Sequence, residues 1–454
     1  MPVFPKRFMA ASALCLAVLL AGLIVPGSAC AIEQARTRFL TSTEPVDPNW
    51  VAERAVGQNA GDRAIRAIYS EGNVVAQAIS KALAGRGQNE LPIWAARGVC
   101  VDLTDKDLSE ILAEFPTLRS ETLDQTAEPI SSSLPVVSSL PRLESTAPNS
   151  WNLAMSGSTA LLQERQLTGK NVLVGVVGPD LPVNHPCLRG RVVSAKFFGD
   201  PHQRGGTLED LMLLHPLGVL AGFLPGKFQG VATQVSISLA TVSKGKVKPK
   251  ELMAAIQWVI GPFSEMKPTA LLICVDFSVP APGAMREVLR SCRTAGILPI
   301  LPAGNVPSRI TGIAALPEVL TVGGLDQWKA RAGFSGIGPS VVDGIPVMKP
   351  DLSEPGVSIY GPSSDGAYRF GSGTLQAAAH FAGIWAQVRQ ARPEDDIQVI
   401  LDAMATTTLD LGAFGPDCET GIGLVNPFSA IYTIENPPPP PPAAPLAGRP
   451  TESK

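Results

Sequence analysis

Residues 151–434 alternate between long apolar runs and amphipathic segments, and this alternation constrains the fold more than any other feature of the chain. Continuous apolar runs are typical of strands buried on both faces, and amphipathic segments between them are typical of the helices that cover such a sheet. We therefore expect an α/β domain with a mostly parallel sheet and helices on both faces. The expected strands are 171–177, 235–242, 270–277, 297–301 and 319–323, and the expected helices are 249–259, 284–295, 374–390 and 393–406.

A smaller α+β domain is expected before the sheet domain. Apolar residues recur at helical spacing over 64–83, and residues 98–103 have the composition of a strand. Thr104 and the acidic residue three positions later have the spacing of a capping box, which predicts a second helix. The predicted boundaries are 32–125 for the small domain and 151–435 for the sheet domain.

Two segments have compositions that do not predict a packed structure. Residues 126–150 are rich in Ser and Pro and lack periodicity, which predicts a linker. Residues 436–454 are predicted to be a disordered tail, and they include six consecutive prolines at 437–442. Such a run favours an extended polyproline conformation, either as a stiff spacer or as a contact site.

The first 31 residues have the pattern of a secretory signal peptide. Lys6 and Arg7 precede an apolar run over about 8–25, and small residues follow at 27–31. The pattern predicts export to a periplasmic, cell-envelope or extracellular location. The apolar run is also long enough for an uncleaved membrane anchor, and in that case the protein would stay on a membrane.

Composition excludes some partners and cofactors. A net charge of -3 without long charged blocks gives no electrostatic footprint for nucleic acid. Five cysteines lie outside the signal region, and none of them has the spacing of a metal site, although a disulfide between two of them stays open. The chain also lacks the clustered acidic loop that calcium needs. We therefore expect no metal and no cofactor. The five cysteines outside the signal region are Cys100, Cys187, Cys274, Cys292 and Cys418.

Residues 371–383, Gly-Ser-Gly-Thr-Leu-Gln-Ala-Ala-Ala-His-Phe-Ala-Gly, resemble the nucleophile segment of subtilisin-like serine peptidases. In that family Gly-Thr-Ser-Met-Ala-x-Pro-His-Val-Ala-Gly opens a buried helix, and its serine attacks the scissile carbonyl. Leu375 stands in the place of this serine, and the neighbouring Ser372 and Thr374 match ordinary family positions. Further stretches match the family in order, so the resemblance covers most of the sheet domain. These stretches are 168–177, 184–188, 334–339, 349–356 and 421–426.

The resemblance implies roles for the remaining catalytic positions. Gly178 occupies the position of the triad aspartate, and Asp180, displaced by two residues, is a weak substitute. His215 matches the triad histidine, and Asn305 matches the asparagine that donates to the developing oxyanion. Leucine offers no heteroatom to deprotonate, so an acyl-enzyme cannot form at Leu375.

The resemblance extends to substrate and propeptide segments. Residues 274–280 match the family segment that pairs with the substrate backbone, with Pro280 in place of a glycine. Residues 98–115 look like the second half of the inhibitory propeptide of subtilisins.

The resemblance thus implies a pseudopeptidase that binds a peptide or protein and keeps its own propeptide-like domain attached as a plug. The alternative is a serine-type endopeptidase with a non-standard triad built on His215.

Overall fold

The computed structural model describes residues 35–42, 60–130, 150–180, 183–205, 213–261 and 266–437. Contacts divide the chain into Met1–Ala35 and Arg36–Lys454, and the elements below all belong to the second unit. The predicted signal peptide, most of the predicted linker and nearly all of the predicted tail lie outside the described residues. No described helix combines the length and apolarity needed to cross a membrane.

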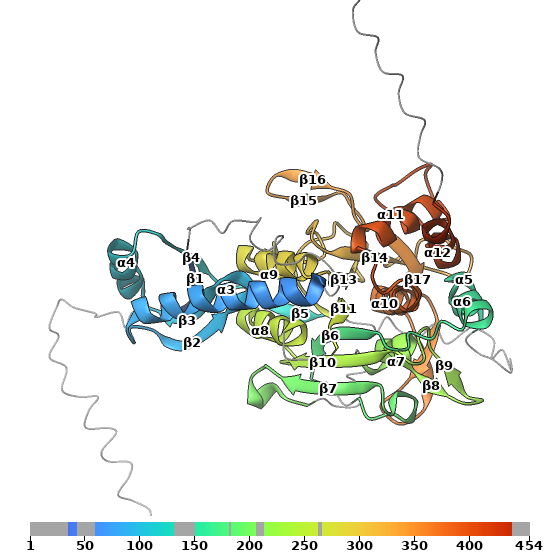
Figure 1. Ribbon diagram of the computed structural model, residues 1–454, viewed down its shortest axis with the longest axis horizontal. Coiled ribbons are helices and arrows are strands. Elements are labelled where there is room, and N and C mark those ends of the chain that lie inside the picture. The colour runs from blue at the N-terminus through green and yellow to red at the C-terminus, as the bar shows by residue number, and fades with distance from the viewer. Residues whose placement is uncertain are drawn as a thin grey trace, which may run out of the picture. The chain divides into compact units, whose positions relative to one another are not determined.

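A seven-stranded sheet forms the centre of the main domain (Figure 1). All its ladders are parallel, as the continuous apolar runs predict. Each residue of the interior strand β6 is buried. The strand order is β17 (Leu352–Pro355), β14 (Leu320–Leu325), β13 (Leu298–Pro302), β11 (Pro268–Ile273), β6 (Leu173–Pro179), β10 (Ser236–Val242) and β7 (Val192–Phe197).

Helices cover the sheet on both faces, and the alternation of side chains along β11 shows this directly. Ala270 and Leu272 belong to one core cluster, and Leu271 and Ile273 belong to the other. The first cluster contains α7 (Leu214–Ala221), α10 (Thr374–Ala391), α11 (Ile397–Thr407) and α12 (Pro427–Glu435), with the short α5 (Ser150–Met155) and α6 (Ser158–Arg165) beside them. The second contains α8 (Pro249–Ile260) and α9 (Gly283–Thr294).

The N-terminal domain is the small α+β unit that the sequence predicts. Its antiparallel sheet has the order β2 (Gln88–Ile93), β3 (Gly98–Leu103), β1 (Arg36–Ser42) and β4 (Leu118–Thr122), packed against α3 (Ala60–Leu83) and α4 (Asp105–Glu114). The capping box is present, because the Thr104 side chain accepts from Asp107 N at 3.1 Å.

This domain packs on α8 and α9 through a short 3₁₀ helix, η1 (Trp94–Ala96). Ser291 Oγ donates to Ala95 O at 2.6 Å. The carboxylate of Glu121 accepts from Gly283 N at 2.7 Å and from Ala284 N at 2.9 Å, so it caps the positive end of α9. The N-terminal domain and the main domain therefore share one apolar core cluster.

Part of the predicted linker is structured. Residues Ala127–Pro129 form β5, which pairs antiparallel with β12 (Val275–Phe277). The sequence predicts one strand over 270–277, whereas the structure divides it at Cys274 into β11 and β12. The division arises because β12 leaves the main sheet to pair with β5.

Candidate active site

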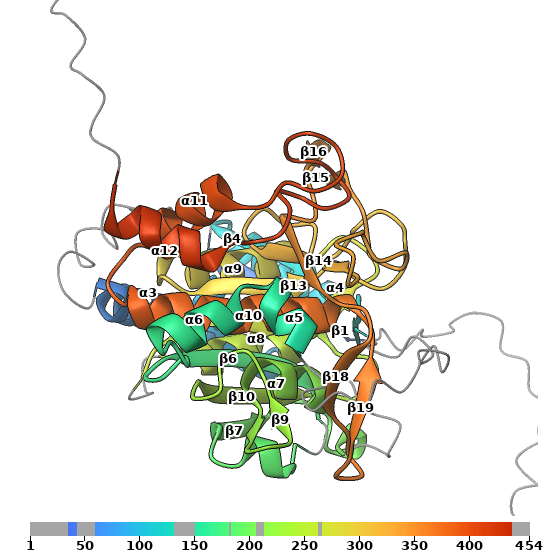
Figure 2. The same cartoon turned by 90° about the vertical axis from the view of Figure 1, so that its right-hand side faces the viewer.

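Leu375 lies in the first turn of α10, which begins at the carboxyl edge of the sheet (Figure 2). Its side chain is fully buried, at 0% exposure, and belongs to the core cluster around α10. Thr374 and Gln376 on either side are buried as well. The position that matches the family nucleophile therefore holds a side chain that packs inward and offers no reacting atom.

Asn305 lies beside this turn, as the resemblance implies. It follows β13, and its Oδ1 accepts from Thr374 N at 2.8 Å and from Thr374 Oγ1 at 3.0 Å. The Thr374 hydroxyl is thus engaged with Asn305 and buried. The structure brings Asn305 to the start of α10, whereas its role toward an oxyanion stays a prediction.

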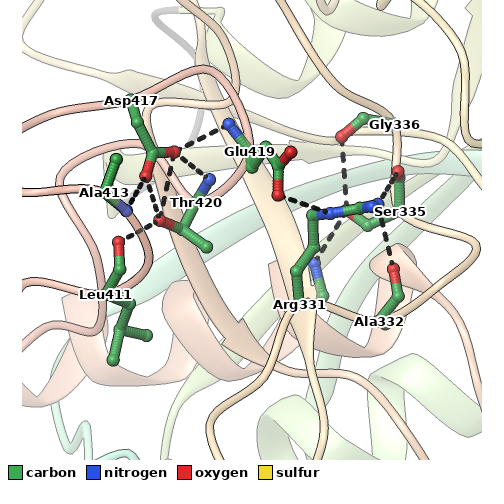
Figure 3. A network of polar contacts seen from close by, with 10 residues as sticks. Arg331, Ala332, Ser335, Gly336, Leu411, Ala413, Asp417, Glu419 and Thr420 are labelled. Carbon is green, nitrogen blue, oxygen red and sulfur yellow. Dashed lines mark hydrogen bonds and ion pairs between the residues drawn. The ribbon is translucent and has the colours of Figure 1, made fainter.

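A polar network joins the turn at residues 331–336 to the loop that holds Asp417 and Glu419 (Figure 3). Asp417 accepts from Glu419 N at 2.7 Å, which fixes its loop, and Glu419 forms an ion pair with Arg331 at 3.3 Å. Arg331 also donates to carbonyls of its own turn. Gly336 N, at the end of that turn, donates to Gly304 O at 3.1 Å. The loop next to the α10 turn is therefore held from outside the main sheet.

His215, in the first turn of α7, is buried and makes hydrogen bonds through both ring nitrogens. Its Nε2 lies 3.1 Å from Ile359 O and 3.3 Å from Arg369 O. Carbonyls only accept, so we assign the proton to Nε2. Nδ1 lies 3.3 Å from Gln376 Nε2, which donates to it. Burial lowers the pKa of His215 to about 4, so the ring is neutral near pH 7.

This tautomer is the reverse of the one that a serine triad uses. In a triad, Nδ1–H faces the aspartate, and Nε2 takes the proton of the nucleophile. The His215 ring instead faces the hairpin of β18 (Ile359–Pro362) and β19 (Tyr368–Gly371). A Cβ atom at Gly361 would lie 2.7 Å from His215 Nε2, so the ring is packed against glycine backbone. Both ring nitrogens are thus engaged by backbone carbonyls and by Gln376.

Gly178 and Asp180 do not rebuild the missing carboxylate. A Cβ atom at Gly178 would lie 2.9 Å from Cδ1 of Leu213, so leucine fills the space beside the position of the triad aspartate. The carboxylate of Asp180 accepts from Thr241 Oγ1 at 2.7 Å and from Gly205 N at 2.9 Å. His215 is not among these partners. Asp180 thus holds the neighbouring loop in place.

The chain's own β5 lies in the place that the resemblance gives to substrate. Ala127 exchanges two hydrogen bonds of 2.8 Å with Val247, while its other side pairs with β12. Ile130 N then donates to Cys274 O at 2.9 Å. Cys274 Cβ would lie 3.3 Å from a Cβ at Gly178. The segment 127–130 therefore runs between β12 and Val247, and Ile130 contacts Cys274, which lies beside Gly178.

Sequence reasoning missed a buried polar path behind the site. His380 Nδ1 lies 2.8 Å from Gln376 O, and its Nε2 lies 2.7 Å from Asn152 Nδ2. Together with the contact between Gln376 and His215, this path joins two neutral histidines, because burial lowers the pKa of His380 to about 4 as well. The i, i+4 spacing of Gln376 and His380 on one helix could have indicated the first link.

The cysteines and other metal-ligating residues add no further chemistry. All five cysteines outside the signal region are free thiols, and four of them are buried. Burial raises the pKa of the Cys187 thiol to about 11. Within the described part of the chain, no three His, Cys, Asp or Glu side chains gather into a group that could hold a metal ion.

The parallel sheet, the buried helix opening beside Asn305 and the N-terminal domain on α8 and α9 define a chain with the architecture of a subtilisin-like peptidase. The model of the Subtilase family matches residues 169–423, which is more than half of the chain. The chain therefore belongs to the subtilase family.

Several subtilisins are similar to this chain. It is 26% identical over 271 residues to Subtilisin NAT of Bacillus subtilis subsp. natto, covering 55% of this chain and 64% of that protein. It is 25% identical over 279 residues to Subtilisin DY of Bacillus licheniformis, covering 58% of this chain and 92% of that protein.

The crystal structure of fervidolysin from Fervidobacterium pennivorans, a keratinolytic enzyme related to subtilisin, has the same fold. The TM-score is 0.59 at 21% identity, over 89% of this chain and 62% of that one.

Proposed function

We propose that this subtilase does not cleave peptide bonds and instead binds a peptide or a protein. The observation that carries the proposal is the fully buried Leu375 at the position of the nucleophile. In the subtilisin triad, loss of the serine alone lowers kcat by roughly six orders of magnitude. Such a chain would retain only the weak rate that binding and an oxyanion site supply.

Two further features support the loss of catalysis. His215 donates from Nε2 to backbone carbonyls, and Leu213 fills the space beside Gly178. A single reversion at Leu375 would therefore leave the new serine without a base. Leu375, His215 and Gly178 thus each support the loss of catalysis. Asn305 differs from them, because it lies beside the start of α10 as the resemblance implies.

The segment 127–130 supports a retained N-terminal domain. Family propeptides are removed by their own catalytic domain, so a chain without a nucleophile keeps this domain attached. The contacts of Ala127 with Val247 and with β12 use the backbone groups to which a substrate strand would add. A peptide partner at this position has to displace the chain's own segment.

A cleavage assay on a broad peptide library, with purified subtilisin as the positive control, tests the proposal. We expect no cleavage above background at enzyme concentrations a thousand times those of the control. Turnover that disappears in His215→Ala would overturn the proposal and support the alternative, a serine endopeptidase built on this histidine.

Retention of the N-terminal domain has its own test. Intact mass spectrometry of protein purified from its natural source should show residues 32–150 still attached. Loss of that part, with no other protease present that makes the cut, would contradict retention.

We also propose that the protein is exported, because residues 1–31 have the pattern of a signal peptide. Fractionation of cells that express the full chain, followed by immunoblotting, tests this. Recovery in the cytoplasmic fraction with an uncut N-terminus would count against export.

A further inference from the structure

The far end of α10 opens on a cavity at the amino edge of the sheet, away from the candidate active site. Its volume is about 450 Å³, and its lining contains two cationic side chains and no acidic one. It lies where β6 and β11 begin, whereas Leu375 and Asn305 lie beyond the opposite edge. The lining residues are Lys170, Asn171, Val172, Thr269, Arg389, Gln390 and Pro393.

Arg389 lines the cavity, and its guanidinium is only partly used in hydrogen bonds. Nη1 donates to Asp395 O at 2.5 Å, and the guanidinium lies 6.0 Å from the ring centre of Trp385. Nε is buried and has no hydrogen-bond partner among the described residues. Nε and Nη2 share one edge of the planar group, and this edge matches a bidentate oxoanion.

Thr269 adds a second polar atom of this kind. Its Oγ1 is buried and has no hydrogen-bond partner within the described ranges. Its carbonyl accepts from Trp385 Nε1 at 3.1 Å, which fixes Thr269 relative to the ring beneath Arg389. Buried polar atoms in native proteins are rarely left unpaired, so two of them on one cavity wall call for a ligand or ordered water.

The turn at residues 168–170 forms another wall of the cavity, and it carries the cation Lys170. Gln390 Oε1 accepts from the backbone N–H groups of Thr168 and Gly169 at 2.7 Å and of Lys170 at 3.1 Å, which fixes this turn. The Lys170 backbone is thus held at the cavity while its side chain is exposed.

Three carboxylates lie close enough to Arg389 to act on its charge, those of Glu394, Asp395 and Asp396. Asp395 forms an ion pair with Arg392, and Asp396 caps α11 by accepting from Gln398 N at 2.7 Å. The lining of the cavity itself carries two cations and no carboxylate.

We propose that this cavity binds a small oxoanion, either a phosphate or a carboxylate, through the Nε–Nη2 edge of Arg389, the Lys170 ammonium and the Thr269 hydroxyl. A donor pair of this kind favours an oxoanion over chloride, because two oxygens of a carboxylate or phosphate can each accept one of the two parallel N–H groups. The proposal stands independently of whether the protein cleaves peptides.

Titration calorimetry on the full chain, with inorganic phosphate and then acetate at constant ionic strength, tests the proposal. We expect saturable binding of one anion per chain, and no such binding when sodium chloride is titrated. The two probes distinguish a phosphate site from a carboxylate site. Equal heats for phosphate, acetate and chloride would overturn the proposal.

Variants locate the site. Arg389→Lys keeps the charge but removes the fork, and should weaken binding by tenfold or more. Lys170→Ala should weaken it about three- to tenfold, and Thr269→Val about threefold. Lys227→Ala removes an exposed lysine from the distant turn between β8 (Phe223–Leu224) and β9 (Phe228–Gln229), and should leave binding unchanged.

Circular dichroism checks that each variant is folded, and if Arg389→Lys is not, the other two variants decide. Binding by Lys170→Ala and Thr269→Val at the strength of the unmodified chain would contradict the assignment. So would an equal loss in Lys227→Ala.

Discussion

The first and the last turn of α10 differ in the chemistry of their side chains. At the first turn, the fully buried Leu375 stands at the position that resembles the family nucleophile, beside Asn305. At the last turn, Arg389 keeps a buried donor without a partner in the described structure and faces a cavity. One helix thus joins the turn that we propose to be catalytically inactive to the cavity for which we propose oxoanion binding. The fold persists because the helix body is buried throughout.

The largest expected difference from subtilisin concerns a hydroxyl restored at position 375. Leu375→Ser should leave peptide cleavage at background, roughly six orders of magnitude below subtilisin, because His215 holds its proton on Nε2 and no carboxylate of the described residues is among its hydrogen-bond partners. A fluorogenic peptide assay measures the rate. Turnover gained by this single change would show that the base survives and that only the nucleophile was lost.

Truncation of a side chain should lower the free energy of unfolding more at the first turn of α10 than at the cavity beside its last turn. Leu375→Ala removes fully buried methyl groups and should lower the free energy of unfolding by about 2–5 kcal/mol. Lys170→Ala removes an exposed side chain and should change it by less than about 0.5 kcal/mol. Urea unfolding of both variants gives the comparison. Equal effects would mean that Leu375 is not packed as described.

Low pH should lower the free energy of unfolding through the two buried histidines near the first turn of α10. Unfolded histidine has a pKa near 6.5, while burial lowers the pKa of His215 and of His380 to about 4. Both are neutral when folded, so their contribution is complete above pH 6.5 and is lost as the pH falls toward 4. The loss is up to ~3 kcal/mol for each histidine.

Urea unfolding at pH 7.5 and 5.0 measures this loss. Burial raises the pKa of Asp276 to about 7, which acts in the opposite direction, so the comparison with a variant isolates the histidine contribution. His380→Gln should reduce the pH dependence, and His202→Gln, at an exposed position, should not. Identical pH profiles for the His380 variant and the unmodified chain would refute the neutral assignment.

The smallest expected effect concerns the docking of the N-terminal domain. Glu121→Gln removes the charge that caps α9 and should cost about 1 kcal/mol. Hydrogen exchange of residues 127–130 should become faster, because this segment follows directly from the docked domain. Asp124→Asn, at an exposed neighbouring position, is the control. An equal change in both variants would show that Glu121 does not stabilise the docking of the N-terminal domain on α9.

The buried strands were predictable because their apolar runs are continuous, and the helices α8, α9, α10 and α11 because their segments have helical spacing. Other strands escaped prediction, and two of them show the physical reasons. β7 is an edge strand that is partly exposed along its length, so it lacks a continuous apolar run. β5 exists because of a partner far along the chain, and the predicted strand 270–277 is divided because β12 leaves the main sheet for that partner.

The site was predictable in its residues and only partly in their contacts. The order of motifs placed Asn305 beside the turn of Leu375, and the structure has this arrangement. No sequence pattern indicated that His215 would face carbonyls 144 and 154 residues away. Nor did one indicate that Leu213 would fill the space at Gly178. Such contacts depend on packing between elements that are distant in sequence.

We propose that no hydroxyl in this chain is activated by His215. Labelling of the folded full-length protein with a fluorophosphonate probe, followed by mass spectrometry, measures this activation. We expect no covalent adduct under conditions that label subtilisin completely. An adduct on any serine or threonine that vanishes in His215→Ala would contradict it.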